Sequence, residues 1–114
     1  MGKAALMAVV LTGLLWGCAP SREELLETGK NEFTAGRTEQ AKATFQRTLY
    51  YYPGEPEAMY ALGRIWHSEG NLPQAIFYYR SCLDSAPWHG RARIWLERAV
   101  VDAKSEPEDF GYNY

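Results

Sequence analysis

Apolar residues recur every three or four positions in five segments of the chain, and short glycine-, proline- or polar-rich stretches separate these segments. Residues at this spacing lie on one side of an α-helix, so each segment predicts a helix that buries one stripe. The predicted helices cover residues 22–35, 38–52, 56–69, 72–85 and 89–104. The pattern therefore predicts an all-α protein.

A set of landmark residues occurs twice along the chain at a constant interval of 34 residues, a period typical of stacked helix pairs. Glycine inside a helix costs roughly 1 kcal/mol relative to alanine, so Gly29 and Gly63 predict close approach of a second helix. We expect Phe45 and Tyr79 to fill the gap at these two crossings. The other landmarks are Gly36, Ala41 and Pro53 in the first copy and Gly70, Ala75 and Pro87 in the second.

This pattern resembles the tetratricopeptide repeat, which is a pair of antiparallel helices. The resemblance implies an antiparallel helix-pair solenoid over residues 22–104, with repeats at 22–55 and 56–89 and a capping helix at 89–104. It also implies binding of a protein or peptide, and it names no partner. The second copy carries the resemblance best, through Leu62, Gly63, Trp66, Gly70, Ala75, Tyr79 and Pro87.

The fifth predicted helix has the features of a cap on the stack. Glu97 stands where the repeat calls for glycine, and no sixth helix is predicted after it. Trp95 is its largest apolar side chain, so we expect it to carry much of the packing. The predicted apolar side comprises Trp88, Ala92, Trp95, Leu96, Ala99, Val100 and Ala103. The second helix is expected to bury Ala41, Ala43, Phe45 and Leu49.

Residues 1–17 are predicted to be a signal peptide. Lys3 precedes an apolar run from Ala4 to Leu15, which has about the length of a signal-peptide core and is short for a membrane-spanning helix. The run ends in Leu-Trp-Gly-Cys, which resembles the lipobox of bacterial lipoproteins and implies lipidation of Cys18. Several acyl chains give firm membrane attachment. The alternatives are an uncleaved membrane helix and an ordinary signal peptide.

The residues that follow the expected lipid site indicate the membrane in which the protein lies and the length of the linker before the first helix. Ala19 rather than aspartate follows Cys18, which by resemblance to lipoproteins of Gram-negative bacteria implies the outer membrane, facing the periplasm. Ser21 and Glu24 have the spacing of a capping box, in which each residue satisfies the backbone N–H of the other. The linker is therefore only residues 18–21, and we expect the helical domain to lie close to the membrane.

Three features of the sequence each allow two interpretations. The acidic, aromatic tail at 105–114 is either disordered or becomes ordered on a partner. The triplet Tyr50-Tyr51-Tyr52 is either helix-end packing or an exposed aromatic patch. Cys82 is either a small apolar core residue or a reactive thiol. The acidic and aromatic residues of the tail are Glu106, Glu108, Asp109, Phe110, Tyr112 and Tyr114.

Composition argues against several classes of function. The net charge of −2 gives no electrostatic case for nucleic-acid binding. His67 and His89 have no nearby carboxylates or cysteines at metal-ligand spacing, and the chain has no glycine-rich phosphate loop. We therefore expect no enzyme activity, no cofactor and no small-molecule substrate.

The candidate binding residues lie on the first helix of each repeat, which lines the concave side in the family that this chain resembles. Lys30, Arg64 and Arg98 recur there at the 34-residue interval. A cationic stripe with aromatic walls would suit an extended segment that carries carboxylates. The alternative is that the bases pair with local acids, namely Glu27, Glu57 and Asp102. The whole predicted protein-binding groove comprises Lys30, Phe33, Tyr60, Arg64, His67, Arg91, Ile94 and Arg98.

The functional hypothesis is a membrane-anchored adaptor that binds another protein of the bacterial envelope. In layout the chain is similar to small tetratricopeptide lipoproteins that assist assembly of pili or secretion machines. The alternative is a structural subunit built permanently into a large membrane complex.

Overall fold

The computed structural model describes residues 19–105. Within this range it contains five helices and no strand: α2 (Arg22–Thr34), α3 (Thr38–Tyr51), α4 (Pro56–Ser68), α5 (Leu72–Ser85) and α6 (Gly90–Ser105). Each helix begins and ends within one residue of its predicted range. The predicted all-α class is confirmed. The predicted signal peptide, the lipidation site Cys18 and tail residues 106–114 lie outside the described residues.

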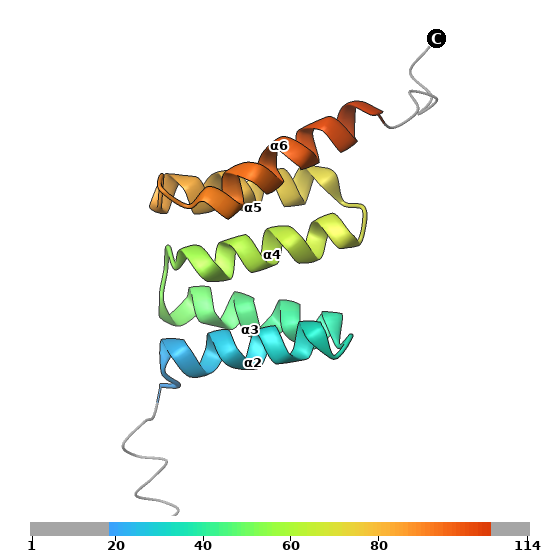
Figure 1. The fold of residues 1–114 in the computed structure, drawn as a ribbon. Coiled ribbons are helices and arrows are strands. Elements are labelled where there is room, and N and C mark those ends of the chain that lie inside the picture. The colour runs from blue at the N-terminus through green and yellow to red at the C-terminus, as the bar shows by residue number, and fades with distance from the viewer. Residues whose placement is uncertain (1–18, 106–114) are drawn as a thin grey trace, which may run out of the picture.

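The helices stack in chain order as antiparallel pairs, α2 with α3 and α4 with α5, and α6 packs on α5 (Figure 1). Contacts also join α2 with α4 and α4 with α6, so these three helices form one continuous face, which is called the concave face below. This is the predicted helix-pair solenoid with a final helix. None of the described helices is long and apolar enough to cross a bilayer.

Glycine makes the closest helix crossing possible in each repeat. A β-carbon placed on Gly29 would lie 2.6 Å from a ring carbon of Phe45, and one on Gly63 would lie 2.5 Å from a ring carbon of Tyr79. Both rings are almost completely buried. Real β-carbons do not approach other atoms so closely, so only glycine fits. The predicted pairing of glycine with a large aromatic residue is confirmed at both crossings.

The helix ends follow local rules that could be predicted from the sequence. The Ser21 hydroxyl accepts a hydrogen bond from the Glu24 amide at 3.1 Å, and the Glu24 carboxylate accepts one from the Ser21 amide at 3.4 Å. This is the predicted capping box. Gly36 and Gly70 follow α2 and α4 with φ of +81° and +80°, a conformation that favours glycine and ends a helix. The capping box thus fixes the start of α2 at Arg22.

The buried core forms two clusters, one between α3 and α4 and one that joins α4, α5 and α6. The first contains Ala41, Phe45, Ala58, Leu62 and Ile65, and the second contains Tyr60, Ala75, Tyr79, Cys82, Ala92 and Ala99. α6 thus completes the core of the second repeat through two alanines, while Trp95 is only partly buried against the same cluster. Cys82 is fully buried without a disulfide, and burial raises the pKa of its thiol to about 11. These properties favour its interpretation as a core residue.

Three predicted packing residues are corrected by the structure. Ala43 is exposed, because the buried stripe of α3 continues from Phe45 to Thr48 instead. Trp88 is 80% exposed because α6 begins only at Gly90, so helical spacing does not extend back to it. Ala103 is exposed in the last turn of α6.

The tyrosine triplet at the end of α3 divides between the two readings left open. The Tyr52 hydroxyl donates a hydrogen bond to the Pro20 carbonyl at 2.9 Å, which fixes the segment before α2. Tyr50 and Tyr51 are both exposed and their rings meet edge to face, with centroids 5.1 Å apart. The first contact is structural, and the other two rings leave an aromatic surface away from the concave face.

Candidate protein-binding groove

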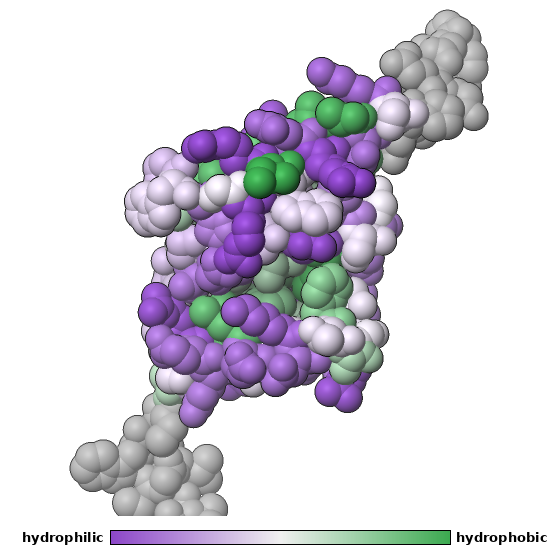
Figure 2. Space-filling model, in the orientation of Figure 1, coloured by the Kyte–Doolittle hydropathy of each residue, from purple (hydrophilic) through white to green (hydrophobic). Residues whose placement is uncertain are grey.

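The concave face contains a hollow of about 250 Å³ between α2 and α4, which extends to the start of α6. Figure 2 shows this face: a hydrophobic surface lies in a depression bordered by hydrophilic side chains. The hollow is lined by Lys30, Phe33, Thr34, Phe45, Glu57, Tyr60, Ala61, Arg64 and Arg91. Five of the eight predicted groove residues therefore line one preformed site: Lys30, Phe33, Tyr60, Arg64 and Arg91.

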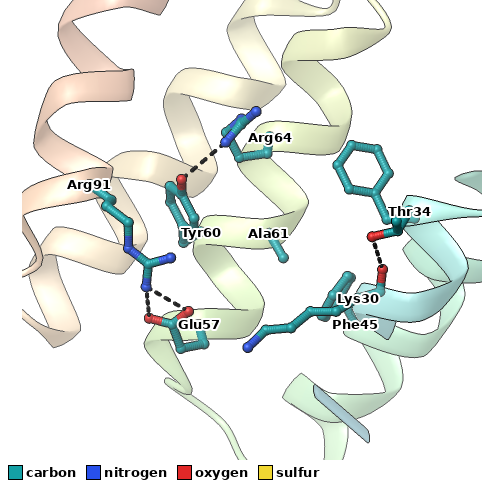
Figure 3. Close-up of a pocket in the computed structure, with 9 residues that line it drawn as sticks. Lys30, Thr34, Phe45, Glu57, Tyr60, Ala61, Arg64 and Arg91 are labelled. Carbon is teal, nitrogen blue, oxygen red and sulfur yellow. Dashed lines mark hydrogen bonds and ion pairs between the residues drawn. The ribbon is translucent and has the colours of Figure 1, made fainter. Parts of the chain in front are cut away.

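The walls of the hollow combine apolar surface with side chains that end in polar groups (Figure 3). Phe45 reaches it from α3 through the space left by Gly29, so the tight crossing also provides its apolar floor. Ala61 is small, which leaves room above α4. Lys30 extends from α2 toward the side on which Glu57 lies. The site is thus apolar at its base and charged at its rim.

Cations and aromatic rings alternate from this hollow toward α6. The Arg91 guanidinium carbon lies 4.9 Å from the centre of the Tyr60 ring. The Tyr60 hydroxyl accepts a hydrogen bond from Arg64 at 3.1 Å, and the Arg64 guanidinium carbon lies 3.6 Å from the centre of the Trp95 ring. The guanidinium carbon of Arg98, which lies on the same helix as Trp95, is 5.8 Å from the centre of that ring. We call these five residues the cation–aromatic row.

Glu57 neutralises one end of the row. It accepts hydrogen bonds from Arg91 at 2.8 Å and 3.1 Å, and from His89 Nε2 at 2.8 Å. His89 Nδ1 accepts from the Ala92 amide at 3.1 Å, so its proton lies on Nε2 and is donated to Glu57. Burial opposes ionisation of Glu57, but the His89 hydrogen bond and the Arg91 charge outweigh it, so the pKa of Glu57 lies below its ordinary value. Arg91 is therefore partly compensated within the protein.

The three bases that recur at the repeat interval differ from Arg91 in this respect. Within residues 19–105, no carboxylate lies within ion-pair distance of Lys30, Arg64 or Arg98. Glu57 pairs with Arg91 and with none of the three recurring bases. Asp102, the last of the candidate acidic partners, is bonded to His67 instead. The concave face consequently keeps positive charge that the described part of the chain does not balance.

The remaining predicted groove residues lie outside the hollow. His67 bridges two helices, since Nε2 donates to Asp102 of α6 at 2.8 Å and Nδ1 lies 3.2 Å from the Tyr79 hydroxyl of α5. Its side chain is only 11% exposed, so it holds the stack together. Ile94 is 64% exposed on α6 but does not line the hollow, and Arg98 lies against Trp95. Within the described range, no cluster of His, Cys, Asp or Glu is arranged to hold a metal ion.

Trp95 is the site residue that sequence reasoning assigned only to packing. A signal was present, because Trp95 stands one repeat interval after Ala61, which lines the hollow. Equivalent positions of successive repeats face the same way. Glu57 and Arg91 are also separated by 34 residues, and this spacing places them opposite each other on neighbouring helices. The repeat register could therefore have found both relationships.

The fold and the repeat interval agree with a comparison against known protein families. Residues 26–87 match the sequence profile described as Tetratricopeptide repeat. The chain belongs to the tetratricopeptide repeat family. Repeats of this family mediate protein–protein interaction, and this is the class of function to which a concave, partly apolar groove corresponds.

A similar tetratricopeptide protein is the probable biofilm formation methyltransferase WspC of Pseudomonas putida. It is 39% identical over 62 residues, which are 54% of this chain and 15% of WspC. The chain thus spans a small part of that protein. The similarity supports the repeat fold and a bacterial relative, and the methyltransferase name belongs to WspC.

Proposed function

We propose that this tetratricopeptide protein is a membrane-anchored adaptor whose concave face binds an extended, acidic segment of another envelope protein. The observation that carries the proposal is the cation–aromatic row beside a preformed hollow. Its bases Arg64 and Arg98, together with Lys30 across the hollow, have no carboxylate partner among residues 19–105.

Stacking prepares Arg64 to recognise a carboxylate. Its guanidinium lies on Trp95, so the side chain is already ordered and loses less entropy when a ligand binds. A stacked guanidinium still presents N–H groups at its edge, and these match a carboxylate in a bidentate geometry. The aromatic residues Tyr60 and Trp95 add apolar contact for neighbouring parts of the ligand. This combination favours a segment that alternates acidic and apolar residues.

The proposed membrane attachment rests on the sequence before α2. The segment Leu15-Trp16-Gly17-Cys18 resembles a lipobox, and lipidation of Cys18 would attach the protein to the outer membrane on its periplasmic side. The capping box at Ser21 starts α2 three residues later. The groove would then lie close to the membrane surface, where it could hold a partner during assembly of a pilus or secretion machine.

A second candidate is a permanent structural subunit of a membrane complex. One observation favours it: Ile94 and Val101 on α6 are 64% and 62% exposed, and Trp88 just before α6 is 80% exposed. Such apolar exposure is common where another protein packs. A structural subunit would be unstable alone and would co-purify in fixed ratio, whereas an adaptor would stay folded with an open groove.

Peptide binding tests the proposed recognition. Three labelled peptides of equal length and equal aromatic content, but with acidic, neutral or basic charge, would be titrated into the full chain by fluorescence anisotropy. We expect binding of the acidic peptide alone, and its loss in Arg64→Glu/Arg98→Glu. The matched control is Arg47→Glu/Arg80→Glu, which reverses two exposed charges on the outer helices α3 and α5. Equal binding by all three peptides, or equal loss in the control, would refute the proposal.

A further inference from the structure

The chain carries its own segment of the composition that the groove favours. Residues 106–114 contain Glu106, Glu108 and Asp109 and three aromatic residues, and they contain no lysine or arginine. They follow directly on α6, which contributes Trp95 and Arg98 to the cation–aromatic row. We propose that this segment folds back and occupies the α6 end of the row, at Arg64, Trp95 and Arg98, in the same molecule. The inference rests on the proposed function, because it assigns a particular occupant to the same face.

Charge complementarity is the first argument. Arg64 and Arg98 both lie against one ring, which brings two positive charges together without a carboxylate partner in residues 19–105. Asp102, which follows Arg98 by one helical turn on α6, is already bonded to His67. Glu106, Glu108 and Asp109 are the next acids along the chain. Opposite charges at close range stabilise one another, and short covalent separation raises their effective concentration.

Reach is the second argument. At 1.5 Å per helical residue, Arg98 lies about 10 Å and Trp95 about 15 Å back along α6 from Ser105. Nine residues in extended conformation can span about 30 Å. Pro107 has no backbone N–H with which to continue the hydrogen bonding of α6. The segment can therefore reach the row, while Lys30 and the hollow on the α2 side stay open for a partner.

The consequence is a groove that is covered at one end until a partner displaces the segment. The apparent affinity for an acidic ligand is then lower than the intrinsic affinity by the fraction of molecules in which the row is open. Only ligands that also contact the α2 side, through Lys30 and the hollow, would compete well. This arrangement selects for long acidic segments over short ones.

Zero-length cross-linking tests the placement. The full chain with Arg98→Lys would be treated with a carbodiimide, which joins an amine to a carboxylate in contact with it, and digested for mass spectrometry. We expect an amide between position 98 and one of the three tail acids, in the monomer and at a yield independent of protein concentration. The matched control is Arg80→Lys on the outer surface of α5, and Lys104 reports that the reaction works. The inference would be overturned if the cross-link yield at position 98 did not exceed the yield at position 80. It would also be overturned if cross-links formed only between two chains.

A competition experiment separates this inference from the proposed function. The tail is neutralised in Glu106→Gln/Glu108→Gln/Asp109→Asn, and a labelled peptide with the sequence of residues 106–114 is titrated into this variant and into the native chain. We expect tighter binding by the variant and loss of that binding when Arg64→Glu/Arg98→Glu is added. Equal affinity in variant and native chain would overturn the tail as occupant and leave the groove intact. No binding of any acidic peptide to either chain would overturn both proposals.

Discussion

The guanidinium carbon of Arg64 in α4 lies 3.6 Å from the centre of the Trp95 ring in α6. This contact joins the second repeat to the last helix and at the same time orients a cation on the concave face. A cation over an aromatic face contributes on the order of 0.5–1 kcal/mol at exposed sites and more when desolvated. One pair of residues therefore contributes to stability and, in the proposed function, to recognition.

The two tryptophans of the last segment should differ sharply in their effect on stability. Trp95 is partly buried and also meets His67 edge to face at 5.6 Å, so Trp95→Ala should lower the free energy of unfolding by about 2–3 kcal/mol, below the cost for a fully buried tryptophan. Trp88→Ala should change it by less than about 0.5 kcal/mol because Trp88 is 80% exposed. Urea denaturation followed by circular dichroism measures both. Equal effects would show that the packing of α6 is assigned wrongly.

Substitution of glycine by alanine should have opposite effects at two helical positions. A β-carbon at Gly63 would overlap the Tyr79 ring, so Gly63→Ala should destabilise by about 1–3 kcal/mol through overpacking. No atom lies within 4 Å of a β-carbon at Gly90, so Gly90→Ala should be neutral or slightly stabilising. Thermal melts of the two variants provide the comparison. A stabilised Gly63→Ala protein would contradict the close crossing.

The first repeat and the core of the second were predictable because steric rules determine them. The interval between Gly29 and Gly63, and the aromatic residue opposite each, follow from one requirement for close helix approach. The prediction that Trp88 packs on the apolar side of the last helix was wrong, because periodicity alone does not say where a helix starts. The start of α6 depends on the His89 ring accepting a hydrogen bond from the Ala92 amide, a tertiary arrangement that also involves Glu57.

The candidate binding face was only partly predictable for a related reason. Repeat spacing located Lys30, Arg64 and Arg98, but it could not say which acids would pair with them. Asp102 bonds to His67 because both side chains meet between α4 and α6. Pairing of side chains between helices depends on rotamers and distances that a single sequence does not contain.

Acid should weaken the fold through Glu57. Its pKa is lower in the folded protein than the ordinary value of 4.5, since the His89 hydrogen bond and the Arg91 charge outweigh the effect of burial. A carboxyl group of this kind contributes stability above its unfolded pKa and loses that contribution as the pH falls through its folded pKa. The free energy of unfolding should therefore decrease below about pH 4.5, and the decrease should be smaller in Glu57→Gln. Denaturation between pH 3 and pH 6 measures the difference, and identical slopes for both proteins would contradict it.

Membrane attachment should depend on one thiol. Cys18→Ser should abolish metabolic labelling with a radioactive or clickable fatty acid, because the thiol is the acceptor in the proposed lipidation. Cys82→Ser is the matched control, since Cys82 is buried in the core and should not accept lipid. Labelling that survives Cys18→Ser would refute the lipoprotein assignment.

Quantitative capture from the envelope tests the central claim most directly. The full chain and its Arg64→Glu/Arg98→Glu variant would be purified from detergent-solubilised envelopes, with Arg47→Glu/Arg80→Glu as control, and co-purifying proteins quantified by mass spectrometry. Circular dichroism would verify equal helical content. We predict that a protein with an acidic segment is recovered by the native chain and the control and lost from the groove variant. Recovery of the same proteins in equal amounts by all three chains would contradict binding through the cation–aromatic row.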